Sequence, residues 1–387
     1  MIDSMKLNKK IYYIANARMP TEKAHGIQLA KMCEAFVEQG VDFELVVPHR
    51  RTYDASIKTF YGLRVDIATK KLSIINTYAW GRIGFFLGSI SFAFGYFFYL
   101  LKKRLRGESF VIYTVDIDQF SFFLIPFIGV PYFCEIHDAK KKSILFARFF
   151  KHAVGIVTIN SIIKKELSVV FGIALKKIIV HPNGIDMAMF ASPLSRLEAR
   201  TRLGLPNQKA IVLYVGKFYD WKGIGDLVIA ARLLETEVDV YAIGGDMREL
   251  MAASGVKELP ISLHCQGTKA FTEIPLWLFA ADALLVLGTK QNDYSYLHTS
   301  PMKLFEYMAS RRPIVASGTP ANREIIGDGE ALLYESDNPN DLAEKVRYAL
   351  SHHDDMEKRA AWAYEKVKNF SWDRRSGHIL EFMKTHL

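Results

Sequence analysis

The chain has 387 residues, of which half are hydrophobic and 24% are charged, and this composition excludes an intrinsically disordered protein. The length is enough for two domains with separate cores. The net charge of +9 comes from the first half: residues 1–190 hold 26 Lys and Arg against 15 Asp and Glu, while residues 191–387 hold 24 against 26. A basic half indicates an anionic partner, and nucleic acid and an acidic membrane surface are the two candidates.

The cysteines and the N-terminus indicate a cellular compartment. Cys33, Cys134 and Cys265 lie far apart in apolar surroundings, so they match neither a disulfide framework nor metal-ligand spacing. This pattern favours a reducing environment. The first residues, MIDSMKLNKKIYYIAN, contain no apolar segment followed by a cleavage site, so we expect no secretory signal and a cytoplasmic location.

Short apolar segments alternate with helical patterns along the chain. In the first half the predicted strands are residues 11–15, 43–47, 110–115, 132–136, 155–159 and 177–181. In the second half they are residues 210–216, 239–245, 261–267, 282–288 and 313–318. Strands that are apolar on both faces and separated by helices predict parallel sheets covered on both sides. We therefore expect an α/β protein with two doubly wound, Rossmann-like domains.

The alternation restarts after a polar, turn-rich segment over residues 183–209, which we interpret as a linker. The predicted domains are residues 1–190 and residues 191–370. A last helix over residues 371–387 is expected to pack back towards the first domain. Two such domains would face each other across a cleft at the carboxyl ends of their strands, where folds of this kind bind ligands.

Residues 83–101 carry no charge, and Arg82 and the basic residues 102–106 flank them. As a helix they would be about 28 Å long, close to the thickness of a bilayer core. Three interpretations stay open: a membrane span, a buried crossover helix, and a crossover helix that also contacts a membrane. A span would separate the strands before and after it and destroy the first sheet. The flanking basic residues favour membrane contact.

A second apolar helix, in YLHTSPMKLFEYMA, has an unusual start. We expect Ser300 or Thr299 to cap it and Pro301 to occupy its first position. Several backbone N–H groups would then be free at its N-terminus. Lys303 in the first turn is unfavourable next to the helix dipole, which prefers an acid there. A bound phosphate would resolve this conflict, because it accepts from the N–H groups and neutralises the lysine.

Glu306 lies one turn further along this helix, too deep to act only as a cap. Its carboxylate could accept two hydrogen bonds from a vicinal diol such as a ribose. The alternative for both charges is an exposed Lys303 and a Glu306 that is paired with a neighbouring cation.

A third group of candidates follows the predicted strand that ends at Gly216. Lys217 and Lys222 lie on the loop before a helix that begins near Gly223. A strand end, a glycine, two lysines and a helix N-terminus predict a cationic site for a diphosphate. The segment does not match the G-x-x-x-x-G-K-[ST] phosphate loop, and lysines on surface loops are also common.

Two weaker candidates lie in the first half. His25 and Gly26 precede an amphipathic helix, where a glycine would let a ligand approach the backbone. His137 and Asp138 follow a buried strand, where polar side chains can reach a substrate. The alternatives are a loop glycine with a solvated histidine, and a turn motif.

Two other motifs do not support a site. The DID segment at 116–118 imitates a D-x-D metal site, but no second acidic cluster completes it. IGGD at 243–246 is too short for a dinucleotide fingerprint, so a dehydrogenase is disfavoured.

These segments, in this order, resemble the retaining glycosyltransferases of family 4, which have the GT-B fold. The resemblance covers most of the chain. It is carried by HG (25–26), EIHD (135–138), HPNGID (181–186), VGKFYDWKG (215–223) and TSPMKLFEYMASRRPIVAS (299–317). The last segment is close to the SPxKxFEYMA form of many bacterial members.

The resemblance implies roles for the catalytic candidates, which are His137, Lys217 and Lys222, and for Gly26 and His25, which would bind the substrate. Gly26, next to His25, would contact the donor through its backbone, and His137 would lie beside the donor sugar near the reacting carbon. Lys217 and Lys222 would hold the diphosphate.

The resemblance also implies a donor-binding segment, formed by His298, Thr299, Ser300, Met302 and Lys303. Glu306 would bind the ribose and Asn183 would shape the cleft. His298 departs from the family's E-x7-E pattern, which has a glutamate at this position, and this departure leaves the donor sugar open.

The implied activity is that of a metal-independent, retaining hexosyltransferase without a cofactor. It would move a sugar from a UDP- or GDP-linked donor to a cell-envelope glycan or a lipid-linked acceptor. The basic first half would then lie on the inner face of the plasma membrane, and no RNA-binding signature supports nucleic acid. Two alternatives stay open: a nucleotide-sugar epimerase of similar fold, and a non-catalytic, membrane-associated scaffold, for which His298 is the sequence hint.

Overall fold

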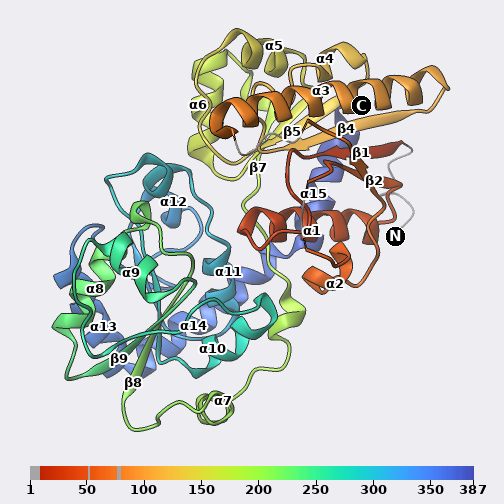
Figure 1. Cartoon of the computed structure of the whole chain (residues 1–387). Coiled ribbons are helices and arrows are strands. Elements are labelled where there is room, and N and C mark those ends of the chain that lie inside the picture. Colours follow the sequence, from red (N-terminus) through yellow and green to blue (C-terminus); the bar gives the residue numbers. More distant parts are fainter. Residues whose placement is uncertain (1–8, 51–52, 76–79) are drawn as a thin grey trace. The chain divides into compact units, whose positions relative to one another are not determined.

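The computed structural model describes residues 9–50, 53–75 and 80–387. The chain forms two compact units (Figure 1). The first unit comprises Met1–Asn183 and Trp372–Leu387, and the second comprises Gly184–Ser371. The prediction of two parallel, doubly wound α/β domains is confirmed.

The first unit contains a seven-stranded parallel sheet in the order β3-β2-β1-β4-β5-β6-β7. Its strands are β1 (Lys10–Ile14), β2 (Phe43–Pro48), β3 (Thr69–Leu72), β4 (Phe110–Val115), β5 (Tyr132–Ile136), β6 (Gly155–Thr158) and β7 (Ile178–Val180). The strand order reverses between β1 and β4, so this pair forms the topological switch point at which doubly wound sheets bind ligands.

Helices cover both faces of this sheet (Figure 1). They are α1 (Ala24–Glu38), α2 (Ile57–Tyr61), α3 (Gly81–Leu105), α4 (Ile125–Ile128), α5 (Ile144–His152), α6 (Ser161–Phe171) and α15 (Trp372–Thr385). Helices α3 to α6 share one core with the sheet, and α1 packs against α15 on the other face. The last helix of the chain is therefore part of the first unit.

Local sequence sets the ends of these helices. The Asn160 side chain accepts a hydrogen bond from the backbone N–H of Ile163 and so caps the start of α6. Gly172 ends the same helix in the left-handed conformation that glycine adopts at low cost.

Helix α3, which contains the uncharged segment 83–101, is the crossover between β3 and β4. It is long and apolar enough to cross a membrane, with a mean hydropathy of 1.7 over 18 residues, of which 39% are buried in the protein. One stripe of the helix, with Phe92, Tyr96 and Leu100, is fully buried against the sheet. The opposite stripe exposes large apolar side chains, including Phe94 and Phe98.

The second unit contains a six-stranded parallel sheet in the order β10-β9-β8-β11-β12-β13. Its strands are β8 (Ala210–Val215), β9 (Val238–Ile243), β10 (Leu263–Cys265), β11 (Ala283–Val286), β12 (Ile314–Ser317) and β13 (Leu332–Tyr334). Its helices are α7 (Arg196–Leu203), α8 (Ile224–Leu233), α9 (Met247–Ser254), α10 (Ile274–Ala280), α11 (Met302–Ala309), α12 (Pro320–Arg323), α13 (Pro339–Ser351) and α14 (His353–Val367). Two apolar cores lie on opposite faces of this sheet, and its switch point is the pair β8 and β11.

Two edge strands, β3 and β13, are absent from the strands that the sequence predicts. β3 has the sequence TKKL, and its two lysines are exposed. Lysine on an edge strand discourages pairing with other chains, but it also removes the apolar signal by which a strand is recognised in the sequence.

Candidate functional site

The carboxyl end of β8 gathers three lysines in the second unit. Lys217 and Lys222 lie on the loop that follows Gly216, and Lys303 reaches this loop from the first turn of α11. A Cβ atom added to Gly216 would lie 3.0 Å from the Lys303 Nζ, so the amino group lies directly over the glycine. Gly216 also has φ +146°, a conformation that side chains other than glycine rarely adopt.

The lysines influence one another electrostatically. Burial, together with the charge of Lys217, lowers the pKa of Lys222 to about 8. Burial and then the charge of Lys222 hold the pKa of Lys303 well below its usual range, against the opposing effect of Glu306. Three mutually repelling amino groups at the switch point of a sheet form a site that an anion would stabilise.

Glu306 lies one turn beyond Lys303 on α11. Burial raises the pKa of its carboxyl group to about 7, although Lys303 acts to lower it. Within residues 9–50, 53–75 and 80–387, neither the Glu306 carboxylate nor the Lys303 amino group forms a hydrogen bond or an ion pair. Lys303 is half-buried rather than exposed, and its charge acts on Glu306 without a direct contact.

Aromatic rings surround the amino groups. The Lys303 Nζ lies 3.9 Å from the centroid of the Tyr214 ring, and the Lys222 Nζ lies 5.1 Å from that of Tyr219 and 5.2 Å from that of Trp221. Cation–π contacts of this kind hold a lysine without neutralising its charge. Lys222 and Lys303 are thus held in place and still available to an anion.

The start of α11 differs from the prediction. The helix begins at Met302, Pro301 occupies the N-cap position, and no side chain in the described part of the chain accepts a capping hydrogen bond there. The expectation that Ser300 or Thr299 caps the helix, with Pro301 at its first helical position, is therefore wrong. The predicted start is early by a single residue, which is within the usual uncertainty of a helix end, and a neighbouring hydroxyl alone does not fix the register.

The residues before α11 follow a short π-helix, Tyr294–His298. His298 is its last residue and is 5% exposed, and Ser300 is equally buried. Thr299 and Met302 are half-buried. Irregular helical turns of this kind recur at functional sites.

The first unit holds a separate group of candidates around a pocket of about 160 Å³. The pocket lies where β1 and β4 end, at the switch point of the first sheet. It is lined by Ala15, Asn16, Ala17, His25, Gln28, Leu29, Val115 and Asp116. His25 is therefore at the place where a ligand of this unit would bind.

Gly26 has a structural reason to be glycine. A Cβ atom there would lie 2.4 Å from the Thr21 Cγ2 and 2.4 Å from the Tyr61 hydroxyl oxygen. The same hydroxyl accepts from the Thr21 backbone N–H at 2.7 Å. The close approach at Gly26 in this structure is thus made by the protein itself.

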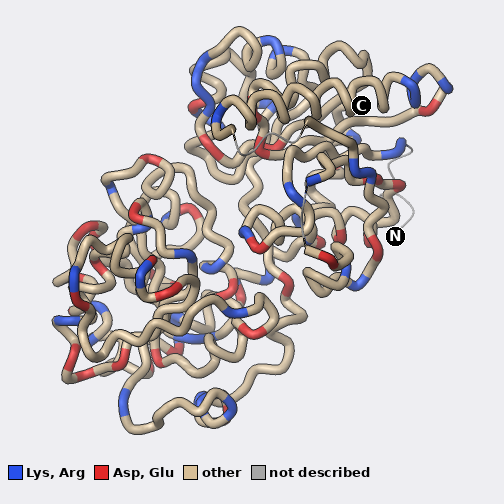
Figure 2. Tube along the Cα trace, in the orientation of Figure 1, with Lys and Arg blue, Asp and Glu red and all other residues tan. Residues whose placement is uncertain are grey.

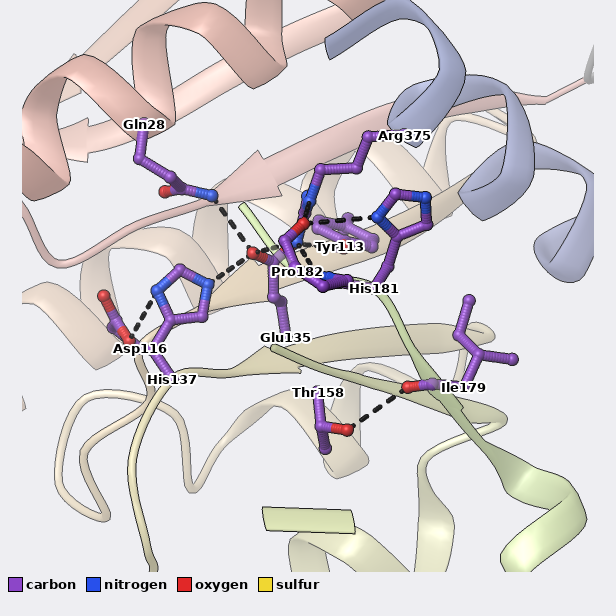
Figure 3. A network of polar contacts seen from close by, with 10 residues as sticks. All are labelled: Gln28, Tyr113, Asp116, Glu135, His137, Thr158, Ile179, His181, Pro182 and Arg375. Carbon is purple, nitrogen blue, oxygen red and sulfur yellow. Dashed lines mark hydrogen bonds and ion pairs between the residues drawn. The ribbon is translucent and has the colours of Figure 1, made fainter. Parts of the chain in front are cut away.

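His137 follows β5 and belongs to a network of polar contacts (Figure 3). Its Nε2 is hydrogen-bonded to the Glu135 carboxylate, and its Nδ1 lies 3.4 Å from the Asp116 Oδ1. Asp116 also lines the pocket, so His137 lies at the pocket edge. The two carboxylates raise the pKa of His137 even though burial lowers it.

Sequence reasoning missed Glu135 and Arg375, which are both fully buried. The Arg375 guanidinium on α15 binds Glu135 with two hydrogen bonds, of 2.8 Å and 3.1 Å. A glutamate inside the apolar strand YFCEI was one signal for this pair. The other was an arginine on the apolar stripe of the last helix, next to Trp372 and Ile379.

The remaining candidate, Asn183, is the last residue of the stretch that belongs to the first unit, and it is 7% exposed. The structure therefore brings together Lys217, Lys222, Lys303 and Glu306 in the second unit. It places His25, Gly26 and His137 in the first.

Residues 195–368 match the protein family described as "Glycosyl transferases group 1". They form a group 1 glycosyltransferase domain. A curated relative is the D-inositol 3-phosphate glycosyltransferase of a Nocardioides strain, which is 25% identical over 224 residues, or 52% of this chain and 47% of the relative. The chain spans about half the length of the first curated relatives it matches.

Two solved structures share the fold over nearly the whole chain. Sucrose-phosphate synthase from Thermosynechococcus elongatus has a TM-score of 0.76 and 18% identity, over 98% of this chain and 99% of that one. Anabaena HepE in complex with UDP-glucose has a TM-score of 0.71 and 16% identity, over 98% of this chain and 100% of that one. These likenesses confirm the fold class, which is two Rossmann-like units of the kind found in GT-B glycosyltransferases.

Proposed function

We propose that this protein is a metal-independent, retaining glycosyltransferase of the family 4 type. It transfers a hexose from a UDP- or GDP-linked donor to a cell-envelope glycan or a lipid-linked acceptor. The observation that carries the proposal is the cluster of Lys217, Lys222 and Lys303 at the switch point of a group 1 domain. A solved neighbour that binds UDP-glucose supports a nucleotide-sugar donor.

The chemistry follows from the charge that develops during transfer. When the glycosidic bond breaks, the nucleoside diphosphate leaves with additional negative charge. Lys217, Lys222 and Lys303 are already fixed where that charge would form, so they stabilise the leaving group without reorganisation. Glu306, one turn deeper, is placed to accept hydrogen bonds from the ribose hydroxyls.

The donor side is tested by measuring the thermal shift of the full chain with UDP-, GDP- and ADP-sugars, followed by donor turnover. Lys222→Ala is expected to lower turnover by about 10²-fold, the usual effect of losing one preorganised electrostatic group. Glu306→Ala is expected to weaken donor binding. Lys257→Ala, which removes an exposed lysine of the same unit, is the matched control. Full turnover in folded Lys222→Ala would refute the assignment of the site.

The same assay separates the alternatives. An epimerase would convert the sugar of the donor into its epimer in the absence of an acceptor. A transferase would release free nucleoside diphosphate as it glycosylates the acceptor. A non-catalytic scaffold would give no turnover with any donor, and His298→Glu would not create any.

The acceptor side of the proposal concerns the first unit, which we place on the inner face of the plasma membrane. The exposed stripe of α3 carries Phe98, which is 62% exposed, and its last turn is basic (Figure 2). Helix α5 begins with Ile144, which is 88% exposed and follows the exposed residues Lys141 and Lys142. Apolar side chains next to lysines suit an anionic lipid surface.

Vesicle sedimentation tests this placement with the full chain. Binding to vesicles that contain phosphatidylglycerol is expected, with little binding to phosphatidylcholine alone. Ile144→Ser with Lys142→Glu is expected to reduce binding by more than about fivefold, because the loss of one basic residue near the surface alone costs about 1 kcal/mol, and the added acid and the lost apolar side chain add to this. Ile261→Ser is the control, since Ile261 is 90% exposed but belongs to the second unit. Equal binding by both variants would refute this surface.

A further inference from the structure

The Glu135 carboxylate is the centre of the polar network in the first unit (Figure 3). It is fully buried on β5, and it receives donors from four other parts of the unit. The Gln28 side chain donates at 3.0 Å from α1, and the Tyr113 hydroxyl donates at 2.7 Å from β4. Arg375 donates from α15, and the His137 ring contacts the same carboxylate just after β5 ends.

We propose that Glu135 and Arg375 are positioning residues that hold the His137 ring in one orientation at the edge of the pocket. Arg375 fixes the Glu135 carboxylate, and that carboxylate fixes the Nε2 side of the ring. The Asp116 carboxylate faces the Nδ1 side. A helix at the far end of the sequence thereby controls a residue of the candidate site.

The geometry limits what His137 can do. Both ring nitrogens face a carboxylate, and this arrangement favours a ring that carries a proton on each nitrogen and is therefore a cation. An imidazolium in this state has no lone pair with which to accept a proton. His137 therefore serves as an oriented positive charge, and it does not act as a general base.

The surrounding groups support a charged ring. The charged and titratable groups that face His137 are Asp116, Glu135 and Arg375, with the Tyr113 hydroxyl on the far side of Glu135. The charge of Arg375 disfavours a positive His137 ring, but two hydrogen bonds pair the guanidinium with the Glu135 carboxylate. The net effect of these groups is to raise the pKa of His137.

Arg375 is itself held firmly. Its Nε donates to the Pro182 carbonyl oxygen at 2.8 Å, and a terminal nitrogen lies 3.4 Å from the carbonyl oxygen of His181. These two carbonyl groups lie just before Asn183, where the chain leaves the first unit. The chain returns to this unit at Trp372, which is the first residue of the helix that carries Arg375. The guanidinium thus ties together both passages of the chain and the carboxylate that holds His137.

The first experiment measures the His137 ring directly. The full chain is labelled with ¹⁵N-histidine, and the His137 signal is assigned among the 11 histidines by its loss in His137→Gln. In the wild type, both ring nitrogens are expected to carry protons at pH 7. Arg375→Met alone could unfold the unit, so the test variant is Glu135→Gln with Arg375→Met, which removes both charges of the pair. Arg374→Met, at the exposed neighbouring position, is the control.

In the double variant, the His137 ring is expected to be neutral at pH 7, and its affinity for a proton is expected to fall at least tenfold. The His137 signal of Arg374→Met should titrate as in the wild type. A His137 signal that is unchanged in the folded double variant would overturn the proposal. A wild-type ring with one bare nitrogen at pH 7 would also overturn it.

The second experiment uses the proposed activity, on which this part of the inference rests. The double variant is expected to lose on the order of 10²-fold in kcat with little change in the donor KM, as misplacement of a site group would cause. An unchanged kcat in a variant whose ring has lost its charge would show that the orientation of His137 does not matter for transfer. If no protein shows transfer with any donor, the proposed function fails, and the magnetic resonance result still decides the positioning role.

Discussion

The two units treat buried charge in opposite ways. In the first unit, Glu135 and Arg375 are completely buried and bind each other with two hydrogen bonds. In the second, Lys303 and Glu306 are half-buried, lie one turn apart on an apolar helix and form no ion pair with any described residue, although the charge of each affects the pKa of the other. A charge that is moved out of water loses its hydration, and this loss lowers the stability of the folded protein unless a partner compensates for it.

Under the proposed function, the difference separates a structural role from a binding role. A charge whose partner is in the chain contributes to the folded state and to the orientation of its neighbours. Lys303 is held near the like charge of Lys222, which opposes its charged form, and under the proposed function it gains an anionic partner when the diphosphate binds. The comparison can be tested by substituting a charge of each unit and measuring whether the free energy of unfolding rises or falls.

The largest effect is expected from Arg375→Met as a single substitution. It leaves the Glu135 carboxylate buried without its cation, which should lower the free energy of unfolding by about 3–5 kcal/mol. Denaturant unfolding of the full chain, followed by circular dichroism, measures this loss. Adding Glu135→Gln should restore much of the stability, since no unpaired charge then remains. A single variant as stable as the wild type would show that the pair is not the structural element described here.

The pair should also make stability depend on pH. Arg375, against the effect of burial, holds the pKa of Glu135 well below its usual range. The contribution of the ionised carboxylate is therefore complete above the ordinary glutamate pKa and is lost as the pH falls towards the lowered value. The double variant should lack this part of the acid sensitivity.

Lys303→Met should act in the opposite direction. It removes a repelled charge, so the melting temperature of the empty protein should stay the same or rise, while UDP binding should weaken by about 10²-fold. Calorimetric titration with UDP and a thermal melt of the same sample measure both quantities. Lys257→Met should change neither. A loss of stability without a loss of UDP binding would place Lys303 with the structural charges of the first unit.

The comparison also explains how much the sequence could predict. Strands such as YFCEI and AIVLYV carry a strong apolar signal, so both sheets and the lysines at the end of β8 are predictable from the sequence. Glu135 and Arg375 are 240 residues apart, and nothing local to either residue indicates its partner. A local conflict marks both kinds of charge, Lys303 through the helix dipole and Glu135 through its apolar strand, and only the tertiary structure shows that Glu135 has a partner in the chain.

Gly26→Ala tests whether the close approach at Gly26 serves packing within the first unit, as the pairing of Glu135 with Arg375 does. The added Cβ would collide with the Tyr61 hydroxyl and with Thr21, whose backbone carbonyl oxygen lies 3.0 Å away. We expect a loss of about 1–3 kcal/mol, the usual cost of overpacking a closed site. The thermal melt of the variant, with and without UDP, measures it. A stable variant with weakened UDP binding would instead assign Gly26 to the donor site.

The smallest effect is a proton that binds together with the ligand. Because the pKa of Lys222 is lowered to about 8, part of this lysine is neutral in the empty protein near that pH. A bound diphosphate favours the charged form, so UDP binding at pH 8 should take up about half a proton from this residue, as linkage requires. Calorimetry in two buffers of different ionisation enthalpy measures the uptake. Lys222→Arg should remove the part centred near pH 8, because arginine stays charged, and should leave any part that Lys303 contributes. Uptake that is the same in both proteins would mean that Lys222 does not face the diphosphate, and the lysine cluster would then have to be divided into one group that binds and another that does not.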